Sequence, residues 1–175
     1  MPTTPVETDR IRKQVLLRAP RERVWRAIGD AREFGSWFGV ELEGPFVAGQ
    51  VLRGHIVPTT VDPEVARMQE PHAGTPFEIH VEEVEPQRRL AFRWHPGVPE
   101  PGQDPASEPM TLVELLLEDA PGGTLLTLTE SGFDRISLAR RAKALEANEQ
   151  GWTAQVPLIE KYLARDRARD AEHGS

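Results

Sequence analysis

The sequence contains no cysteine and no uninterrupted apolar run of the length that a membrane span requires. Without cysteine the chain has no disulfides, thiol nucleophiles, iron–sulfur clusters or cysteine-ligated zinc sites. A spanning helix needs about 20 mostly apolar residues, so we expect none. Residues 1–9 are polar and lack the apolar centre of a secretion signal. These absences favour a cytoplasmic protein.

Basic residues are fewer than acidic residues. The 28 acidic residues outnumber the 21 basic ones, and the formal net charge is −7. Because general nucleic-acid binding depends on a basic surface, this balance argues against DNA or RNA as a partner. Three of the basic residues are lysines and the others are arginines, a bias typical of GC-rich genes that favours a bacterial source.

The length indicates a single domain with room for a pocket. The chain has 175 residues and a mass of 19.6 kDa, for which one domain is the default. A folded chain of this mass buries about 70% of the surface that the unfolded chain exposes. We expect residues 10–165 to form this domain, between a disordered segment at 1–9 and a charged tail at 166–175.

The chain begins with a strand and two short helices. Residues 10–18 are rich in β-forming side chains and predict the strand. Pro20 suits the first position of a helix that Gly29 ends. Asp30, followed three residues later by Glu33, resembles a capping box that opens a second helix, which Gly39 closes.

Strands and turns dominate the middle of the sequence. Apolar and polar residues alternate at Phe77, Ile79 and Val81, and again at Leu90, Phe92 and Trp94. Such strands have one buried and one solvated face, as in antiparallel sheets. The predicted strands span 40–44, 50–57, 76–85, 88–95, 110–118 and 124–131.

Two longer connections interrupt these strands. Residues 59–74 predict a single helical turn, with Asp62 as its cap and Pro63 at its first position. Residues 96–109 contain five prolines and few large apolar groups, which excludes a helix or strand and predicts a mobile loop. This loop is either a tolerated surface insertion or a pocket lid.

The strongest helical pattern lies at the C-terminal end. Apolar residues recur at steps of three and four from Ser137 to about Arg165, with Pro157 inside the pattern. The order of elements predicts an α+β fold in which a curved antiparallel sheet of six to seven strands wraps round this long helix.

Five short motifs follow one another along residues 10–165. They are Ala19-Pro20-x-x-x-Val24-Trp25-x-Ala27-Ile28, Trp37-Phe38-Gly39, Arg89-Leu90-Ala91-Phe92-x-Trp94, Gly123-Thr124-x-Leu126-x-Leu128-x-Glu130-Ser131-Gly132-Phe133 and Asn148-Glu149-x-Gly151-Trp152. In this order they resemble the SRPBCC superfamily, also called START-like or Bet v 1-like, which has the helix-grip fold. Within it the chain is most similar to the homologues of the activator of the heat-shock-protein-90 ATPase. The resemblance implies a seven-stranded sheet and a pocket between it and the long helix.

The pocket prediction rests on side chains expected to face inward. Aromatic and aliphatic residues with a few polar groups are typical of small-molecule sites. The same pattern is also that of a filled core, so the sequence leaves both open. The candidate ligand-binding residues are Trp37, Phe38, Phe77, Ile79, Phe92, Trp94, Val113, Leu115, Leu126, Leu128, Glu130, Glu149, Trp152 and Val156. Gly151 is interpreted as a site of close approach between helix and sheet.

Glu130 is the one candidate for catalysis. It shares the strand parity of Leu126 and Leu128, so it is expected to face inward, where a carboxyl group acts as acid or base. His55 and His80 could lie close together if their strands pair, but two histidines without a third ligand make a poor metal site. The sequence contains no Gly-rich phosphate loop, GxSxG or HExxH motif. It therefore predicts neither a cofactor nor a metal.

Three functions follow from these residues. The favoured hypothesis is a binding protein for a small hydrophobic or amphipathic molecule. The second is an enzyme of cyclase, hydratase or hydrolase type that uses Glu130 in the same pocket. The third, from the family resemblance, is a chaperone-associated interaction module. The sequence names no ligand and leaves the oligomeric state open.

Overall fold

The computed structural model describes residues 10–96 and 109–173, without the side chains after Arg165. The strands are β1 (Arg10–Leu17), β2 (Val40–Leu42), β3 (Val51–Ile56), β4 (Pro76–Glu85), β5 (Arg89–Trp94), β6 (Thr111–Ala120) and β7 (Gly123–Ser131). The helices are α1 (Arg21–Gly29), α2 (Ala31–Phe38), α3 (Pro63–Gln69) and α4 (Leu138–His173), with short 3-10 turns η1 (Glu70–His72) and η3 (Phe133–Arg135).

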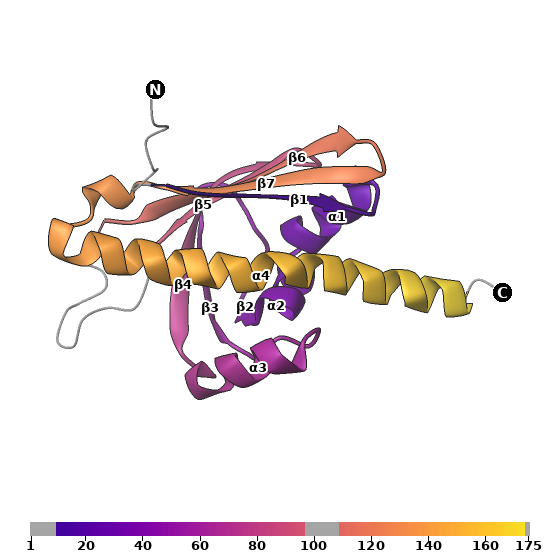
Figure 1. The fold of residues 1–175 in the computed structure, drawn as a ribbon, viewed down its shortest axis with the longest axis horizontal. Coiled ribbons are helices and arrows are strands. Elements are labelled where there is room, and N and C mark those ends of the chain that lie inside the picture. Colours follow the sequence, from indigo (N-terminus) through magenta and orange to yellow (C-terminus); the bar gives the residue numbers. More distant parts are fainter. Residues whose placement is uncertain (1–9, 97–108, 174–175) are drawn as a thin grey trace, which may run out of the picture.

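All seven strands form one antiparallel sheet in the order β1-β7-β6-β5-β4-β3-β2. The sheet curves, and α4 runs along its concave face, with α1 and α2 on the same side (Figure 1). A bulge between Val81 and Glu83 interrupts the regular pairing of β4 with β5. The helix-grip α+β fold predicted from the order of elements is confirmed.

The core lies between the sheet and α4. The inward faces of β6 and β7 alternate as predicted, with Val113, Leu115 and Leu117 buried opposite Leu126 and Leu128. Side chains of α4 close this core from the other side: Trp152, Val156, Leu158, Ile159, Tyr162 and Leu163 are all buried. Burial of this apolar surface, at about 25 cal/mol per Å², is the main force that holds the helix in the sheet.

The helix boundaries follow local capping chemistry. Asp30 begins α2, and its side chain accepts hydrogen bonds from the backbone amides of Arg32 and Glu33 at 3.0 Å. Gly39 ends α2 in the left-handed conformation, with φ of +98°. The prediction for Pro20 was wrong by one position, because it is the N-cap of α1 and not its first residue.

The C-terminal helix is longer than predicted. Helix α4 extends past the expected end at Arg165 to His173, and Pro157 lies inside it as predicted. The expectations for the segment 1–9 and for most of the loop 96–109 lie outside the described residues.

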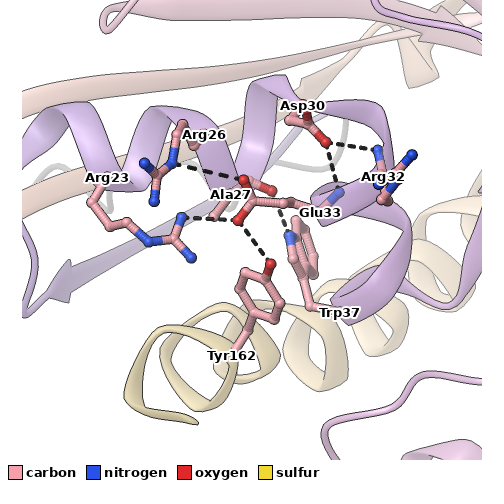
Figure 2. Close-up of polar contacts among 8 residues, drawn as sticks. All are labelled: Arg23, Arg26, Ala27, Asp30, Arg32, Glu33, Trp37 and Tyr162. Carbon is pink, nitrogen blue, oxygen red and sulfur yellow. Dashed lines mark hydrogen bonds and ion pairs between the residues drawn. The ribbon is translucent and has the colours of Figure 1, made fainter. Parts of the chain in front are cut away.

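Glu33 connects α1, α2 and α4 (Figure 2). Its carboxylate pairs with Arg23 at 3.0 Å and with Arg26 at 3.8 Å, and it accepts a hydrogen bond from the Tyr162 hydroxyl at 2.7 Å. The Tyr162 ring also contacts the guanidinium groups of Arg23 and Arg165, whose carbons lie 5.6 and 5.5 Å from its centroid. Glu33 therefore does not close the capping box, because its side chain is used to dock α4.

Tyr162 gives this docking contact a measurable pH dependence. Burial, followed by the hydrogen bond to Glu33, raises the pKa of Tyr162 from 10.0 to about 12. An unfolded chain loses this proton near pH 10 while the folded chain keeps it, so stability falls as the pH rises from about 10 to about 12. Tyr162 is the single tyrosine of the sequence, so the tyrosinate absorbance should titrate near pH 12. The Tyr162→Phe variant should lack this fall in stability. A titration midpoint near pH 10 in the folded protein would contradict the contact.

Candidate functional site

The strands β5, β6 and β7 bring three polar side chains to one face of the sheet. Trp94 lies directly opposite Thr111 in the pairing of β5 with β6. Glu130 lies opposite Val113, which makes Thr111 its diagonal neighbour on the same face. The side-chain period of two, which predicted an inward Glu130, therefore places it beside Thr111 and Trp94.

Helix α4 adds two donors to this group. Asn148 and Trp152 are four residues apart and so share one helix face. The Glu130 carboxylate accepts hydrogen bonds from Asn148 Nδ2 at 2.8 and 3.0 Å and from Trp152 Nε1 at 2.8 Å. It also accepts from Trp94 Nε1 at 2.9 Å and from Thr111 Oγ1 at 2.5 Å. The exposed fraction of Glu130 is 0%.

This arrangement favours a positioning role for Glu130. A carboxylate has about four lone-pair sites, and four side chains already donate to them. A buried carboxylate is stabilised by such donors, because without them its desolvation would cost several kcal/mol. Glu130 thus fixes α4 against β5, β6 and β7, and in this arrangement it presents no exposed oxygen atom for proton transfer to a ligand.

Aromatic rings fill the space beside Glu130. Trp94 and Trp152 stack with ring centroids 5.6 Å apart, and Phe38 lies 6.0 and 5.9 Å from them. Phe92 contacts Trp94 at 5.3 Å, and Phe34 contacts Phe38 at 4.9 Å. At this level the region between sheet and helix is a packed core.

An open groove lies next to this aromatic cluster, between α3 and α4. Its volume is about 260 Å³. The walls come from α2, β2, β3, α3, η1 and α4. The lining residues are Phe38, Gly39, Val40, Ile56, Val65, Met68, Gln69, His72, Gly151, Ala154 and Gln155.

Polar contacts hold α3 at the edge of this groove. None of the side chains of α3 is fully buried, and Val65 packs against the core while partly exposed. Gln69 Nε2 donates to the carbonyl oxygen of Phe38 at 2.9 Å, and Gln69 Oε1 accepts from the Thr59 amide at 2.8 Å. A Cβ at Gly39 would lie 2.5 Å from that Oε1, so glycine is required there for the contact.

An ion pair ties the other end of α3 to α4. Asp62 caps α3 by accepting from the amides of Glu64 and Val65, and it also binds Lys161. The Lys161 ammonium, followed by the amide of Val65, lowers the pKa of Asp62. The predicted cap and the predicted position of Pro63 are confirmed.

Gly151 lies on the groove wall, and the interpretation of its role was wrong. A Cβ at this position would meet nothing within 4 Å, so no close approach between helix and sheet requires a glycine. Gly151 is also exposed. Its effect is to leave open space on the α4 side of the groove.

The predicted ligand-binding residues divide among four locations. Phe38 lines the groove, whereas Trp94, Trp152 and Glu130 form the hydrogen-bonded cluster beside it. Glu149 binds Lys13 of β1 at the surface. The remaining candidates belong to the core or pack against it: Trp37, Phe77, Ile79, Phe92, Val113, Leu115, Leu126, Leu128 and Val156.

Most of the groove was not predicted from the sequence. Val65, Met68, Gln69 and His72 belong to a connection for which only a helical turn was predicted, and Gln155 was not considered. The position of Gln155, four residues after Gly151 on the same helix face, is the signal that could have found it.

The histidines do not form a metal site. Strands β3 and β4 pair, but His55 lies opposite Pro76 and His80 opposite Val51, so the register keeps the two histidines apart. Within residues 10–96 and 109–173, no group of three or more His, Asp or Glu side chains could hold a metal ion. In the same part of the chain, no helix has both the length and the apolar composition of a membrane span.

The structure has two other hollows in its described part. One, of about 820 Å³, is bordered by α2, β2 and the segment 57–60, and its lining includes Asp30, Arg32, Glu33 and Glu41. The other, of about 570 Å³, lies beside the first turns of α4, near Leu138. Neither is lined by an aromatic side chain, whereas the groove between α3 and α4 has Phe38.

The Glu130→Gln variant tests the positioning role. An amide nitrogen would face N–H donors that now bind oxygen, so we expect the free energy of unfolding to fall by about 2 kcal/mol. Urea unfolding measures this change, and near-ultraviolet circular dichroism follows the Trp94–Trp152 stack. Glu118→Gln, at an exposed position of β6, is the matched control and should change stability little. Equal stability of the two variants would contradict the role of Glu130.

Several solved structures share this fold. DynU16, a protein in the dynemicin biosynthetic locus, is 28% identical with a TM-score of 0.62, and the match covers 89% of this chain and 47% of that one. The chain thus spans about half the length of DynU16. The protein encoded by gene BPP1335 of Bordetella parapertussis is 26% identical with a TM-score of 0.61, covering 91% and 78%. MLL2253 of Mesorhizobium loti is 21% identical with a TM-score of 0.65, covering 89% and 97%. Among curated proteins, no sequence matches the chain.

The sequence also matches a family model over most of its length. The match covers residues 18–164 and includes strands β2 to β7, the groove and the Glu130 cluster. Together with the helix-grip fold of the solved structures, it identifies the chain as a member of the family described as Activator of Hsp90 ATPase homolog 1-like protein.

Proposed function

We propose that this protein binds a small, mainly apolar molecule in the groove between α3 and α4. The helix-grip fold of the family is a ligand-binding fold, and such folds typically hold small hydrophobic molecules. The observation that carries the proposal is an open groove lined by apolar side chains and bordered by a helical glycine with free space at its Cβ.

The groove has the composition of a small-molecule site. Its apolar residues are Phe38, Val40, Ile56, Val65, Met68 and Ala154, and its polar side chains are Gln69, His72 and Gln155. Ligand sites commonly combine an apolar lining with a few polar groups, in volumes of about 300–1,000 Å³. At about 260 Å³, this groove suits a ligand at or below the small end of that range.

Gly151 supports the proposal because glycine makes α4 less stable and packing does not require it. A glycine inside a helix is less favourable than alanine by about 1 kcal/mol, and the surroundings of Gly151 would accept a Cβ. Packing within the protein therefore gives no reason for this residue. A ligand that approaches the α4 backbone would explain the glycine, because any larger side chain would occupy part of the ligand site.

Phe38 connects the groove to the aromatic cluster. It lines the groove, and its ring lies 5.9 Å from Trp152 and 6.0 Å from Trp94. A ligand that displaces this ring should therefore alter tryptophan emission. A similar protein, DynU16, belongs to a biosynthetic locus, which is consistent with a small molecule as the partner.

The other functions suggested by the sequence have weaker support. Catalysis by Glu130 would require its carboxylate to leave four hydrogen-bond donors. The hypothesis of a chaperone partner rests on the family description and on no surface feature of the described residues.

We also propose that residues 10–165 act as one domain and that the protein works in the cytoplasm.

Filling the groove tests the proposal. In the Gly151→Leu variant, a side chain on α4 extends into the open space, so we expect affinity for the probe naphthol to fall about tenfold or more. The melting temperature should stay the same or rise, because leucine is a better helix former than glycine. Equilibrium dialysis of the full chain with naphthol measures the affinity.

Ala164→Leu is the matched control, since it adds the same side chain to an exposed position of α4 outside the groove. Its naphthol affinity should equal that of the unmodified protein. Equal affinity in Gly151→Leu and in the unmodified chain would overturn the proposal.

A further inference from the structure

The side chain of Gln155 is held in one orientation. It lines the groove from α4, and its Nε2 donates to the carbonyl oxygen of Phe38 at 2.9 Å. A carbonyl oxygen can only accept hydrogen bonds, so it determines which end of the amide faces it. Oε1 must therefore point away from the Phe38 carbonyl.

Gln155 Oε1 has no donor. It is buried, and within the described part of the chain no group donates a hydrogen bond to it. Buried polar atoms are nearly always hydrogen-bonded, and leaving one without a partner costs about 1–3 kcal/mol. Gln69, the other glutamine of the groove, differs in this respect because its Oε1 accepts from the Thr59 amide. Gln155 is thus the glutamine with an unused acceptor.

The groove also lacks formal charge. Among the described residues that line it, none is Asp, Glu, Lys or Arg, and the exposed His72 is the one titratable side chain. A charged group that enters an apolar site without a partner of opposite charge loses hydration and gains little in return. The lining therefore disfavours carboxylates, phosphates and ammonium groups, including the head group of a fatty acid.

We infer that the groove selects an uncharged apolar molecule that carries a hydroxyl or N–H group, and that this group donates its hydrogen bond to Gln155 Oε1. The inference rests on the proposed function and specifies its ligand class. Phe38, Val65 and Met68 contact the apolar body of the molecule. Gln155 determines specificity, because a ligand without a donor leaves its oxygen unpaired.

Three probes of similar size separate these features in the full-length chain. Naphthol is neutral and has a donor, methylnaphthalene is neutral without one, and naphthoate is charged at neutral pH. For Gln155→Leu, we expect naphthol affinity to fall by roughly five- to tenfold more than methylnaphthalene affinity, in line with one net hydrogen bond. Naphthoate should bind the unmodified protein at least about tenfold more weakly than naphthol. Equilibrium dialysis measures all three, and thermal unfolding shows that each variant is folded.

Gln69→Leu is the matched control. It also removes a donor to the Phe38 carbonyl, but it leaves Gln155 Oε1 in place. We expect it to weaken naphthol and methylnaphthalene alike.

The two proposals fail in different ways. If naphthol binds but Gln155→Leu weakens both neutral probes equally, or if naphthoate binds best, the assignment of the ligand class is overturned while the groove remains the site. If none of the three probes binds the unmodified protein, the proposed function fails, and the inference fails with it.

Discussion

The buried carboxylate of Glu130 is the constraint on which the rest of the structure depends. Removing a carboxylate from water costs several kcal/mol unless hydrogen bonds replace the lost hydration. Here the replacement comes from β5 (Trp94), β6 (Thr111) and two positions on α4 (Asn148 and Trp152). Because these donors lie on separate elements, their hydrogen bonds to Glu130 hold α4 in place over β5, β6 and β7. The Tyr162–Glu33 contact then fixes the other half of the helix against α1 and α2.

This constraint also explains where the protein has open space. Two of the four donors are indoles, and with Phe38 and Phe92 they pack the region directly beneath α4. The room for a ligand is displaced toward α3, which contributes no buried side chain and is held by Gln69 and by the Asp62–Lys161 pair. Such a segment is attached by a few polar contacts and by the partly buried Val65, whereas the aromatic cluster is held by deep burial. The groove thus joins a rigid wall on the α4 side to a weakly attached wall on the α3 side.

Local patterns were enough to predict the fold and the inward direction of Glu130. Strand parity, the caps at Asp30 and Asp62 and the glycine at Gly39 each act over a few residues, so the sequence displays them directly. The groove depends instead on contacts between distant residues, such as Gln69 and Gln155 on the Phe38 carbonyl. No periodic pattern encodes those contacts. The same limit applies to His55 and His80, whose separation is a matter of strand register, and to Gly151, whose surroundings decide between close packing and open space.

The most direct test of the account is amide and indole NMR of the full chain titrated with naphthol. A ligand in the groove between α3 and α4 should shift the backbone amides of α3 and of residues 151–155. The indole N–H signals of Trp94 and Trp152 should move with them, because both rings contact Phe38. Shifts confined to residues 30–45, or to the first turns of α4 near Leu138, would place binding in another hollow and contradict the account.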